Sequence, residues 1–182
     1  AKFLSTKIGD VNAQDHHGRT PIMLASQEGH FDVVRFLLAR GGKLNIKDHD
    51  DRSVGMLAAI SGNLDLVKFL WEQKADFSQK DTKGRNALML AIIHGNMDVV
   101  QYLVGQGQDI HEVDNEGKNL LLLAVMQNDI KLIKYLQSMG LKLKSRDLYG
   151  NTPVMLAAQN GNSEVIDFFI DAGANLDEID NQ

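Results

Sequence analysis

Short apolar segments alternate with polar, glycine-containing turns along the whole chain, and the alternation recurs at a fixed interval. An aspartate opens each unit, and successive aspartates are 33 residues apart. These aspartates are Asp15, Asp48, Asp81, Asp114, Asp147 and Asp180. A constant interval without insertions predicts a stack of similar units whose contacts run only to their neighbours.

The interval divides the chain into five full units. The expected units are residues 15–47, 48–80, 81–113, 114–146 and 147–179. Residues 1–14 resemble the end of a further unit, because FLSTKIGDVNAQ aligns with FLLARGGKLNIK, and residues 180–182 begin another. We therefore expect one repeat domain over residues 1–182, with a sequence that starts and stops within the pattern.

Each unit predicts a first helix over its sixth to fourteenth residues. The helix starts at a residue whose side-chain oxygen can cap early backbone N–H groups; these caps are Thr20, Ser53, Asn86, Asn119 and Thr152. Pro21 and Pro153 follow two of the caps, at the helical position that tolerates proline best. The expected helix ends are Gly29, Gly62, Gly95, Asn128 and Gly161, residue types that adopt the left-handed conformation.

A second helix is predicted by apolar residues at helical spacing, such as Val33, Val34 and Leu37 in the first unit. It ends near Gly41, Gly107, Gly140 or Gly173. Helices this short are marginal in isolation, so stacking must stabilise them. The chain then extends to the next aspartate, which predicts a hairpin-like loop.

The segments TPIMLA at residues 20–25 and TPVMLA at residues 152–157 resemble the T-P-L-H-x-A signature of the ankyrin repeat. The resemblance extends over essentially the whole chain and implies an all-α solenoid of stacked helix-turn-helix units with hairpin-like loops. The signature histidine is replaced by Met23, Met56, Met89, Leu122 or Met155. We expect thioether packing in the core in place of the histidine's hydrogen bonds.

The second unit departs most from this pattern. Asp51 stands where the turn glycine belongs, and Gly55 stands where the signature leucine belongs. A glycine inside a helix costs about 0.5–1 kcal/mol relative to alanine, and loss of the leucine predicts a packing deficit. We therefore expect residues 48–60 to be a weak point, less protected from hydrogen exchange than residues 152–158.

Charge and composition narrow the possible partners. The net charge is −5, which argues against nucleic acid or an anionic membrane as a partner. The sequence has no cysteine, so we expect a reducing, cytoplasmic location. The longest apolar run, residues 120–126, is far shorter than the ~20 residues of a membrane span.

Residue patterns typical of catalysis or cofactor binding are missing from the sequence. It contains no glycine-rich phosphate loop, and no serine or carboxylate stands in a nucleophile–base arrangement. His16 and His49 occupy equivalent positions in adjacent units, but units packed ~8–10 Å apart would hold them too far apart to share an ion. We expect no enzymatic activity, no cofactor, no metal site and no small-molecule substrate.

Two classes of function remain. The first is a protein-recognition module, as the ankyrin resemblance implies, acting as a monomer on a protein or peptide. The second is an architectural spacer or an intramolecular docking segment of a longer protein whose activity lies elsewhere.

The ankyrin resemblance also implies where a partner binds, since contact positions in that family lie on the hairpin tips and the exposed face of the first helix. The expected tip residues are Arg19, Arg52, Arg85, Lys118, Tyr149 and Asn151, joined by Lys47, Lys80 and Arg146. The expected helix residues are Gln27, Ile60, Ile93, Met126 and Gln159, with His94 beside them as a possible source of pH sensitivity.

Two interpretations of these rows stay open. In the first, a basic rim and an apolar strip in units two to four bind an acidic segment with apolar anchors. In the second, the arginines pair with the unit-opening aspartates, and neighbouring helices partly cover the isoleucines. Two further residue types are expected to be structural: the opening aspartates as turn formers, and Trp71 as packing between helices.

Overall fold

The computed structural model describes residues 9–173, which form ten α-helices and no extended strand. The helices are α1 (Pro21–Gln27), α2 (Phe31–Ala39), α3 (Val54–Ser61), α4 (Leu64–Glu72), α5 (Ala87–Ile93), α6 (Met97–Gly105), α7 (Leu120–Met126), α8 (Ile130–Ser138), α9 (Pro153–Gln159) and α10 (Ser163–Asp171). They form five consecutive helix-turn-helix pairs within this part of the chain, and the expected all-α repeat architecture is confirmed.

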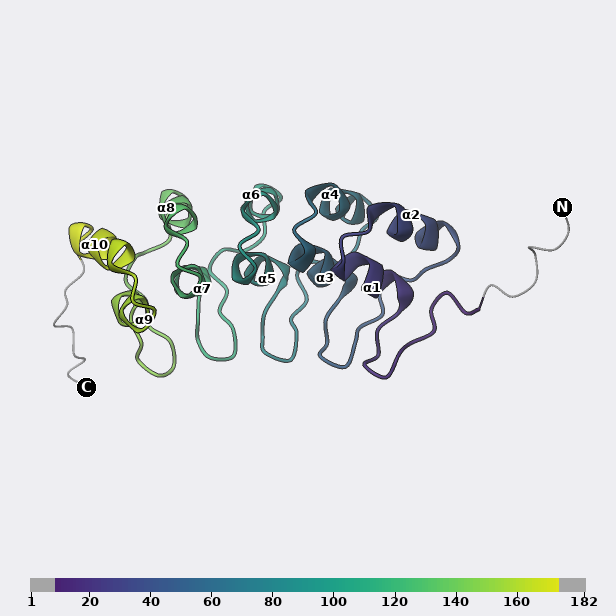
Figure 1. Ribbon diagram of the computed structural model, residues 1–182, viewed down its shortest axis with the longest axis horizontal. Coiled ribbons are helices and arrows are strands. Elements are labelled where there is room, and N and C mark those ends of the chain that lie inside the picture. Colours follow the sequence, from purple (N-terminus) through teal and green to yellow (C-terminus); the bar gives the residue numbers. More distant parts are fainter. Residues whose placement is uncertain (1–8, 174–182) are drawn as a thin grey trace, which may run out of the picture.

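The pairs stack side by side into an elongated array with two helical layers (Figure 1). The odd-numbered helices form the inner layer, and each contacts the odd-numbered helix of the next repeat. The even-numbered helices form the outer layer, while the loops project beyond the inner layer on one side. Helices α1 and α10 lie at opposite ends of the stack.

The first helix of every pair begins at the predicted cap. The Thr20 hydroxyl accepts a hydrogen bond from the Met23 N–H at 3.4 Å, and the Asn86 side chain accepts one from the Met89 N–H at 3.0 Å. Ser53, Asn119 and Thr152 cap their helices in the same way. Because each cap satisfies an N–H that has no partner within the helix, the start of each helix is determined locally.

The predicted ends of the first helices are also confirmed. Gly29 has φ of 71°, and Asn128, the one non-glycine residue at this position, has φ of 57°. Both values lie in the left-handed region, which asparagine adopts more readily than most residues with a side chain.

The unit-opening aspartates build the hairpin turns, as predicted. The Oδ1 atom of Asp81 accepts hydrogen bonds from the N–H groups of Lys83 and Arg85, each at 2.9 Å. Neighbouring turns are joined through the backbone, because the Thr82 N–H donates to the Asp50 carbonyl at 2.9 Å. The row of tips is therefore hydrogen-bonded from one repeat to the next.

A continuous apolar core runs between the two helical layers. Met23, Met56 and Met89 are completely buried, which confirms that methionine packs in place of the signature histidine. The equivalent Met155 is 44% exposed, so the core prediction is wrong at this position. Met155 differs because no described repeat follows it.

Asparagine side chains hydrogen-bond across repeat boundaries. The Asn63 amide donates to the Gly29 carbonyl at 2.8 Å, and the Asn96 amide donates to the carbonyls of Ala59 and Ile60. The Ala59 and Ile60 carbonyls lie in the last turn of α3, where they have no partner within the helix, and Gly29 lies just beyond the end of α1.

The expected packing deficit in the second repeat is absent. Gly55 is the second residue of α3, and a Cβ atom built on it would lie 3.2 Å from the Phe77 ring and 2.7 Å from the Asp76 carbonyl oxygen. Phe77 is almost completely buried and packs beside Trp71, with ring centroids 5.4 Å apart. The Phe77 ring therefore occupies the space that a leucine at position 55 would fill. Trp71 also packs against Tyr102 of α6, as its predicted structural role requires.

Candidate functional site: a groove between the third and fourth repeats

A groove of about 400 Å³ opens between the hairpins and the first helices of the third and fourth repeats. Its lining residues are Thr82, Lys83, Arg85, Ile93, Asp114, Asn115, Glu116, Lys118, Leu123, Met126 and Gln127. Four of the predicted partner-binding residues, Arg85, Ile93, Lys118 and Met126, are thus brought together in one groove.

The floor of the groove is apolar and is supplied by α5 and α7. Met126 is 39% exposed and Ile93 is half-buried, while Leu123 contributes from a nearly buried position. Ile93 and Met126 end consecutive first helices at equivalent positions, so the stacking of the repeats places them side by side. This floor offers an apolar contact surface to a side chain that enters the groove.

Arg85 on the rim is already paired within its own repeat. Its Nε and Nη2 atoms lie 2.9 and 2.6 Å from the Oδ2 atom of Asp81. The Asp81 carboxylate is almost fully buried, so this charge-assisted pair fixes the guanidinium against the turn. Arg85 keeps N–H groups at the groove but contributes little net positive charge there.

Lys118 and Lys83 complete the cationic part of the rim. Lys118 forms an ion pair with Glu116, and this hydrogen bond raises the pKa of the lysine against the opposing effect of burial. Lys83 is exposed on the tip of the third repeat and forms no ion pair with any residue in the range 9–173. Lys83 was absent from the predicted rows, although its position beside the turn aspartate marks it as a tip residue.

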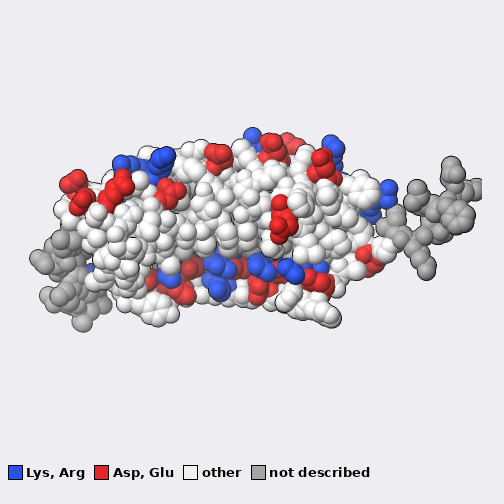
Figure 2. Space-filling model, in the orientation of Figure 1, with Lys and Arg blue, Asp and Glu red and all other residues white. Residues whose placement is uncertain are grey.

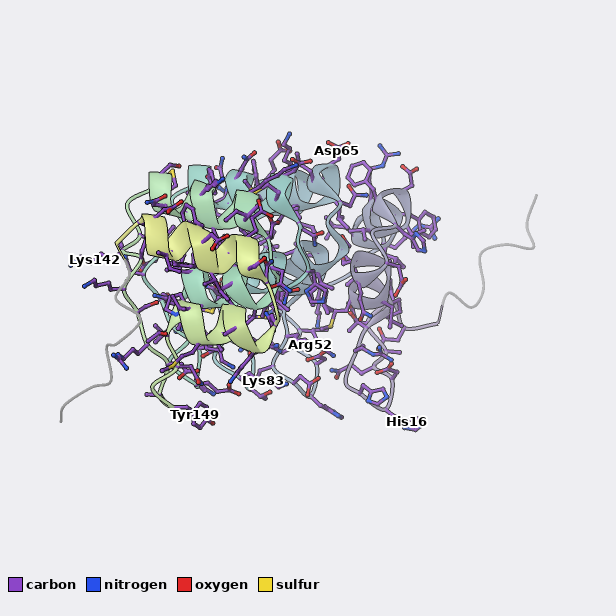
Figure 3. All side chains as sticks on the ribbon, turned by 60° about the vertical axis from the view of Figure 1, so that its left-hand side comes forward. His16, Arg52, Asp65, Lys83, Lys142 and Tyr149 are labelled. Carbon is purple, nitrogen blue, oxygen red and sulfur yellow. The ribbon has the colours of Figure 1, made fainter. Side chains whose placement is uncertain are left out.

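The prediction that the arginines stand at the tips is wrong. The outermost turn residues are the second and third of each repeat, such as Thr82 and Lys83, whereas the arginines are the fifth. Figure 3 shows Lys83 and Tyr149 at the edge of the molecule and Arg52 closer to the helices. The reason is the tight turn, in which the aspartate carboxylate draws the arginine back towards the base of the hairpin.

The same pairing recurs outside the groove. The Arg19 Nη2 atom lies 2.8 Å from the Asp15 Oδ2 atom, and the Arg52 Nε atom lies 2.7 Å from the Asp48 Oδ2 atom. The second interpretation is therefore correct for all three arginines: they pair with the unit-opening aspartates. Figure 2 shows the consequence on the face that it presents, where basic and acidic side chains lie next to each other along the hairpin side of the stack.

The remaining predicted contacts do not line this groove. The Lys80 Nζ atom lies 2.9 Å from the Glu112 Oε2 atom, and the Lys47 Nζ atom lies 4.0 Å from the Asp51 Oδ1 atom. Both lysines therefore form ion pairs among the loops. Ile60 occupies the equivalent position one repeat before Ile93. His94 follows α5, and its Nδ1 atom lies 2.8 Å from the Leu90 carbonyl oxygen. The row's other members, Gln27, Asn151, Arg146 and Gln159, also lie outside the groove lining.

Tyr149 stands apart from the groove at the tip of the fifth repeat. Its side chain is 73% exposed, and that of the adjacent Leu148 is 74% exposed. The other four described tips carry polar residues at these two positions: His16, His17, His49, Asp50, Thr82, Lys83, Asn115 and Glu116. The fifth tip is therefore the apolar end of the row.

Hydrogen bonding lowers the pKa of two of the unit-opening aspartates. Backbone and side-chain hydrogen bonds from Arg19 lower the pKa of Asp15 to about 2. For Asp147, burial works to raise the pKa, but hydrogen bonds from Asn151 and Tyr149 outweigh it and lower the pKa. In both cases the ionised carboxylate is the form that the turn requires.

Residues 9–173 contain no cluster of three or more His, Asp or Glu side chains placed to hold a metal ion. In the same range, every helix is too short or too polar to cross a membrane.

The stacked helix pairs and the hairpin-lined groove define a helical repeat protein of the kind that binds other proteins. Family models described as ankyrin repeats (3 copies) match residues 41–114 and 88–180, and a model of the single ankyrin repeat matches residues 17–49. The chain belongs to the ankyrin repeat family. Ankyrin repeats are generally non-enzymatic protein-interaction modules. A search of curated proteins found no match to the chain.

Proposed function

We propose that this chain is a non-enzymatic recognition module that binds a protein segment in the groove between the third and fourth repeats. The segment carries at least one apolar side chain next to an acidic one. The observation that carries this proposal is the combination, within one groove, of an apolar floor with the exposed Lys83 on its rim.

The two parts of the groove have different roles in this proposal. Ile93 and Met126 are already partly desolvated, so a partner side chain that covers them gains affinity in the way that central hot-spot residues do. Lys83 is solvent-exposed, and it therefore affects the association rate and its salt dependence more than the final affinity.

A screen of random displayed peptides against the whole chain tests the proposal. We expect enrichment of peptides with an acidic residue beside an apolar one. For a selected peptide, Ile93→Ala combined with Met126→Ala should weaken binding by about 2 kcal/mol or more, which is the usual hot-spot range. Fluorescence polarisation at several salt concentrations measures both the affinity and the effect of Lys83→Ala.

Ile60→Ala serves as the matched control because Ile60 holds the position of Ile93 one repeat earlier. It should change the affinity of the same peptide much less than the double variant. If the double variant folds and binds every selected peptide as tightly as the parent chain, the groove is not the recognition site.

The second candidate is an architectural role, in which the repeats form a spacer or an intramolecular docking segment of a longer protein. Under that function the array acts through contacts along its long axis, and the groove is not needed.

A further inference from the structure

One asparagine at the end of α9 differs from every other asparagine of the chain in the residue that follows it. Asn160 is followed by Gly161, and no other Asn-Gly pair occurs in the sequence. Because glycine carries no Cβ atom, nothing on it hinders the approach of its backbone nitrogen to the asparagine side chain. This pair is therefore the place in the chain where a side-chain amide is most open to attack by the backbone.

Water reaches both residues of the pair. Asn160 and Gly161 are exposed, and a Cβ atom built on Gly161 would meet nothing within 4 Å. His94 and Gln127 hold the position of Asn160 in the third and fourth repeats, which have described repeats on both sides, and they are exposed as well. The exposure of Asn160 is thus a property of its position in the repeat and does not depend on where the sequence ends.

The Asn160 side chain connects the fifth repeat to the fourth. Its Nδ2 atom lies 3.3 Å from the Val125 carbonyl oxygen, 3.2 Å from that of Met126 and 3.3 Å from the Asn128 Oδ1 atom. Both carbonyls lie in the last turn of α7. All three partners accept hydrogen bonds, so this contact requires the donating amide group and cannot be made by a carboxylate.

Asn96 provides a comparison within the same molecule. Its amide donates to the two equivalent carbonyls at the end of α3. The residue after Asn96 is Met97, whose side chain hinders access to the peptide nitrogen. Two asparagines therefore make the same kind of contact across a repeat boundary, but only Asn160 precedes a glycine.

In the folded chain, both groups that would react are hydrogen-bonded. The Gly161 N–H donates to the Ala158 carbonyl at 3.1 Å, and the Asn160 amide donates to the carbonyls of α7. A reaction between them requires the end of α9 to open. Local opening of this kind costs less free energy than unfolding of the whole chain.

We propose that Asn160 is a site of spontaneous deamidation, that opening of the end of α9 controls its rate, and that the product loosens the boundary between the fourth and fifth repeats. The Gly161 nitrogen loses its proton to base and attacks the Asn160 Cγ atom. A C–N bond forms, the bond from Cγ to Nδ2 breaks, and ammonia leaves with a proton from water. Water then opens the succinimide ring at either of its two carbonyls. The net reaction exchanges ammonia for water and gives aspartate or isoaspartate at position 160.

Both products remove the contact with α7. A carboxylate has no hydrogen to donate, and it places a negative charge beside three acceptor oxygens. Isoaspartate also adds one carbon to the main chain directly before Gly161, whose φ is 68°. The junction between α9 and α10 is then altered as well, and the change is one-way because ammonia is lost.

Peptide mapping by mass spectrometry tests the site, using the whole folded chain after incubation at mildly alkaline pH. We expect aspartate and isoaspartate to accumulate at Asn160 at least tenfold faster than at Asn96. Gly161→Ala should slow the conversion at least tenfold. Unfolding the parent chain in urea should accelerate it, because both reacting groups lose their hydrogen bonds.

Asn160→Asp reproduces one product and tests its consequence. Amide hydrogen exchange in α9 and α10 should be at least fivefold faster than in the parent chain, while exchange in α1 to α4 should be unchanged. Gln159→Glu is the matched control, because it adds the same charge to the same helix end. The Gln159 side chain is exposed and makes no hydrogen bond within residues 9–173, so this variant should change the exchange much less.

Conversion at Asn160 that is no faster than at Asn96 overturns the proposal. Conversion at the same rate in the folded and the unfolded chain overturns the control by local opening. Equal exchange in Asn160→Asp and Gln159→Glu overturns the loosening of the repeat boundary.

Discussion

The second and third repeats share turn, helix and loop geometry, but they fill the core differently. In the third repeat, Leu88 of α5 and Ile110 of the following loop supply two aliphatic side chains. In the second repeat, Gly55 and Phe77 stand at those two positions, and the Phe77 ring lies against the glycine. The comparison shows that core volume is set by the pair of positions, so a departure from the family signature at one position can be compensated at the other.

The backbones of the two repeats adopt the left-handed conformation at equivalent positions, but with different residue types. The third repeat uses glycine at two of its left-handed positions, Gly84 and Gly107, with φ of 75° and 84°. The second repeat uses Asp51 and Lys74 at the equivalent positions, with φ of 60° and 65°. The second repeat is therefore well packed, but its backbone is locally strained. Lower hydrogen-exchange protection of residues 48–60 stays a prediction, and it now rests on the left-handed conformation of Asp51 and not on a packing deficit.

The largest expected difference between the two repeats comes from truncating the compensating side chain. Phe77→Ala should lower the free energy of unfolding by about 3–5 kcal/mol, because it leaves a cavity beside Gly55 that no other side chain can fill. Ile110→Ala should cost less, since Ile110 is only half-buried. Urea denaturation measures both, and equal losses would contradict the compensating role of Phe77.

The opening aspartates should behave alike in the two repeats. Asp48→Ala and Asp81→Ala each remove an acceptor for two backbone N–H groups and the partner of an arginine. Each substitution should lower the free energy of unfolding by about 2–3 kcal/mol, because hydrogen bonds to a charged group are lost. Asp48→Ala lies outside the groove, so it should leave peptide affinity nearly unchanged at temperatures where the variant is folded. A loss of binding without a shift in melting temperature would refute the structural role.

Adding a side chain to the second repeat sharpens the comparison of the cores. Gly55→Leu should destabilise by about 1–3 kcal/mol through overpacking against Phe77 and the Asp76 carbonyl. Combining it with Phe77→Ile, which imitates the third repeat, should restore part of the loss. A double-mutant cycle measures this coupling, and strictly additive effects would show that the two positions do not share one space.

Relieving the backbone strain at Lys74 should change the stability less than the core substitutions do. Lys74→Gly should stabilise the chain by up to about 1 kcal/mol, because a lysine disfavours the left-handed conformation and glycine does not. Gly107→Ala is the matched reverse change, since a Cβ atom there meets nothing within 4 Å. It should destabilise by a similar amount in thermal denaturation, and a neutral result for both variants would refute the strain.

The smallest effect is expected at acid pH in the first repeat, where the opening carboxylate is more exposed than in the second and third. The pKa of Asp15 is lowered from 3.8 to about 2, so its ionised form stabilises the fold above about pH 4. That contribution disappears as the pH falls towards 2. Asp15→Asn should therefore reduce the acid sensitivity of stability between pH 4 and 2, measured by urea denaturation at each pH. An unchanged pH dependence would show that this carboxylate is not linked to folding.

Features that depend on neighbours in the chain could be predicted from the sequence. The caps, the left-handed helix ends and the aspartate turns all follow from residues at most a few positions apart. Asn128 is an instructive example, because its residue type alone indicated the conformation that the structure shows. The ankyrin resemblance implied that Ile93 and Met126 lie on the exposed face of the first helix, and both line the groove. Their contact with a partner stays a prediction.

Tertiary structure decided whatever depends on residues from different repeats or on the ends of the stack. From the sequence, Arg85 could either be a free cation or pair with the opening aspartate; the folded turn buries Asp81 beside it and holds it away from the tip. Phe77 lies 22 positions after Gly55, so its filling of that space could not be seen in either helix pattern. The same residue type is buried at Met89 and exposed at Met155 because burial depends on the adjacent repeat, and no property of a single repeat specifies whether a neighbour is present.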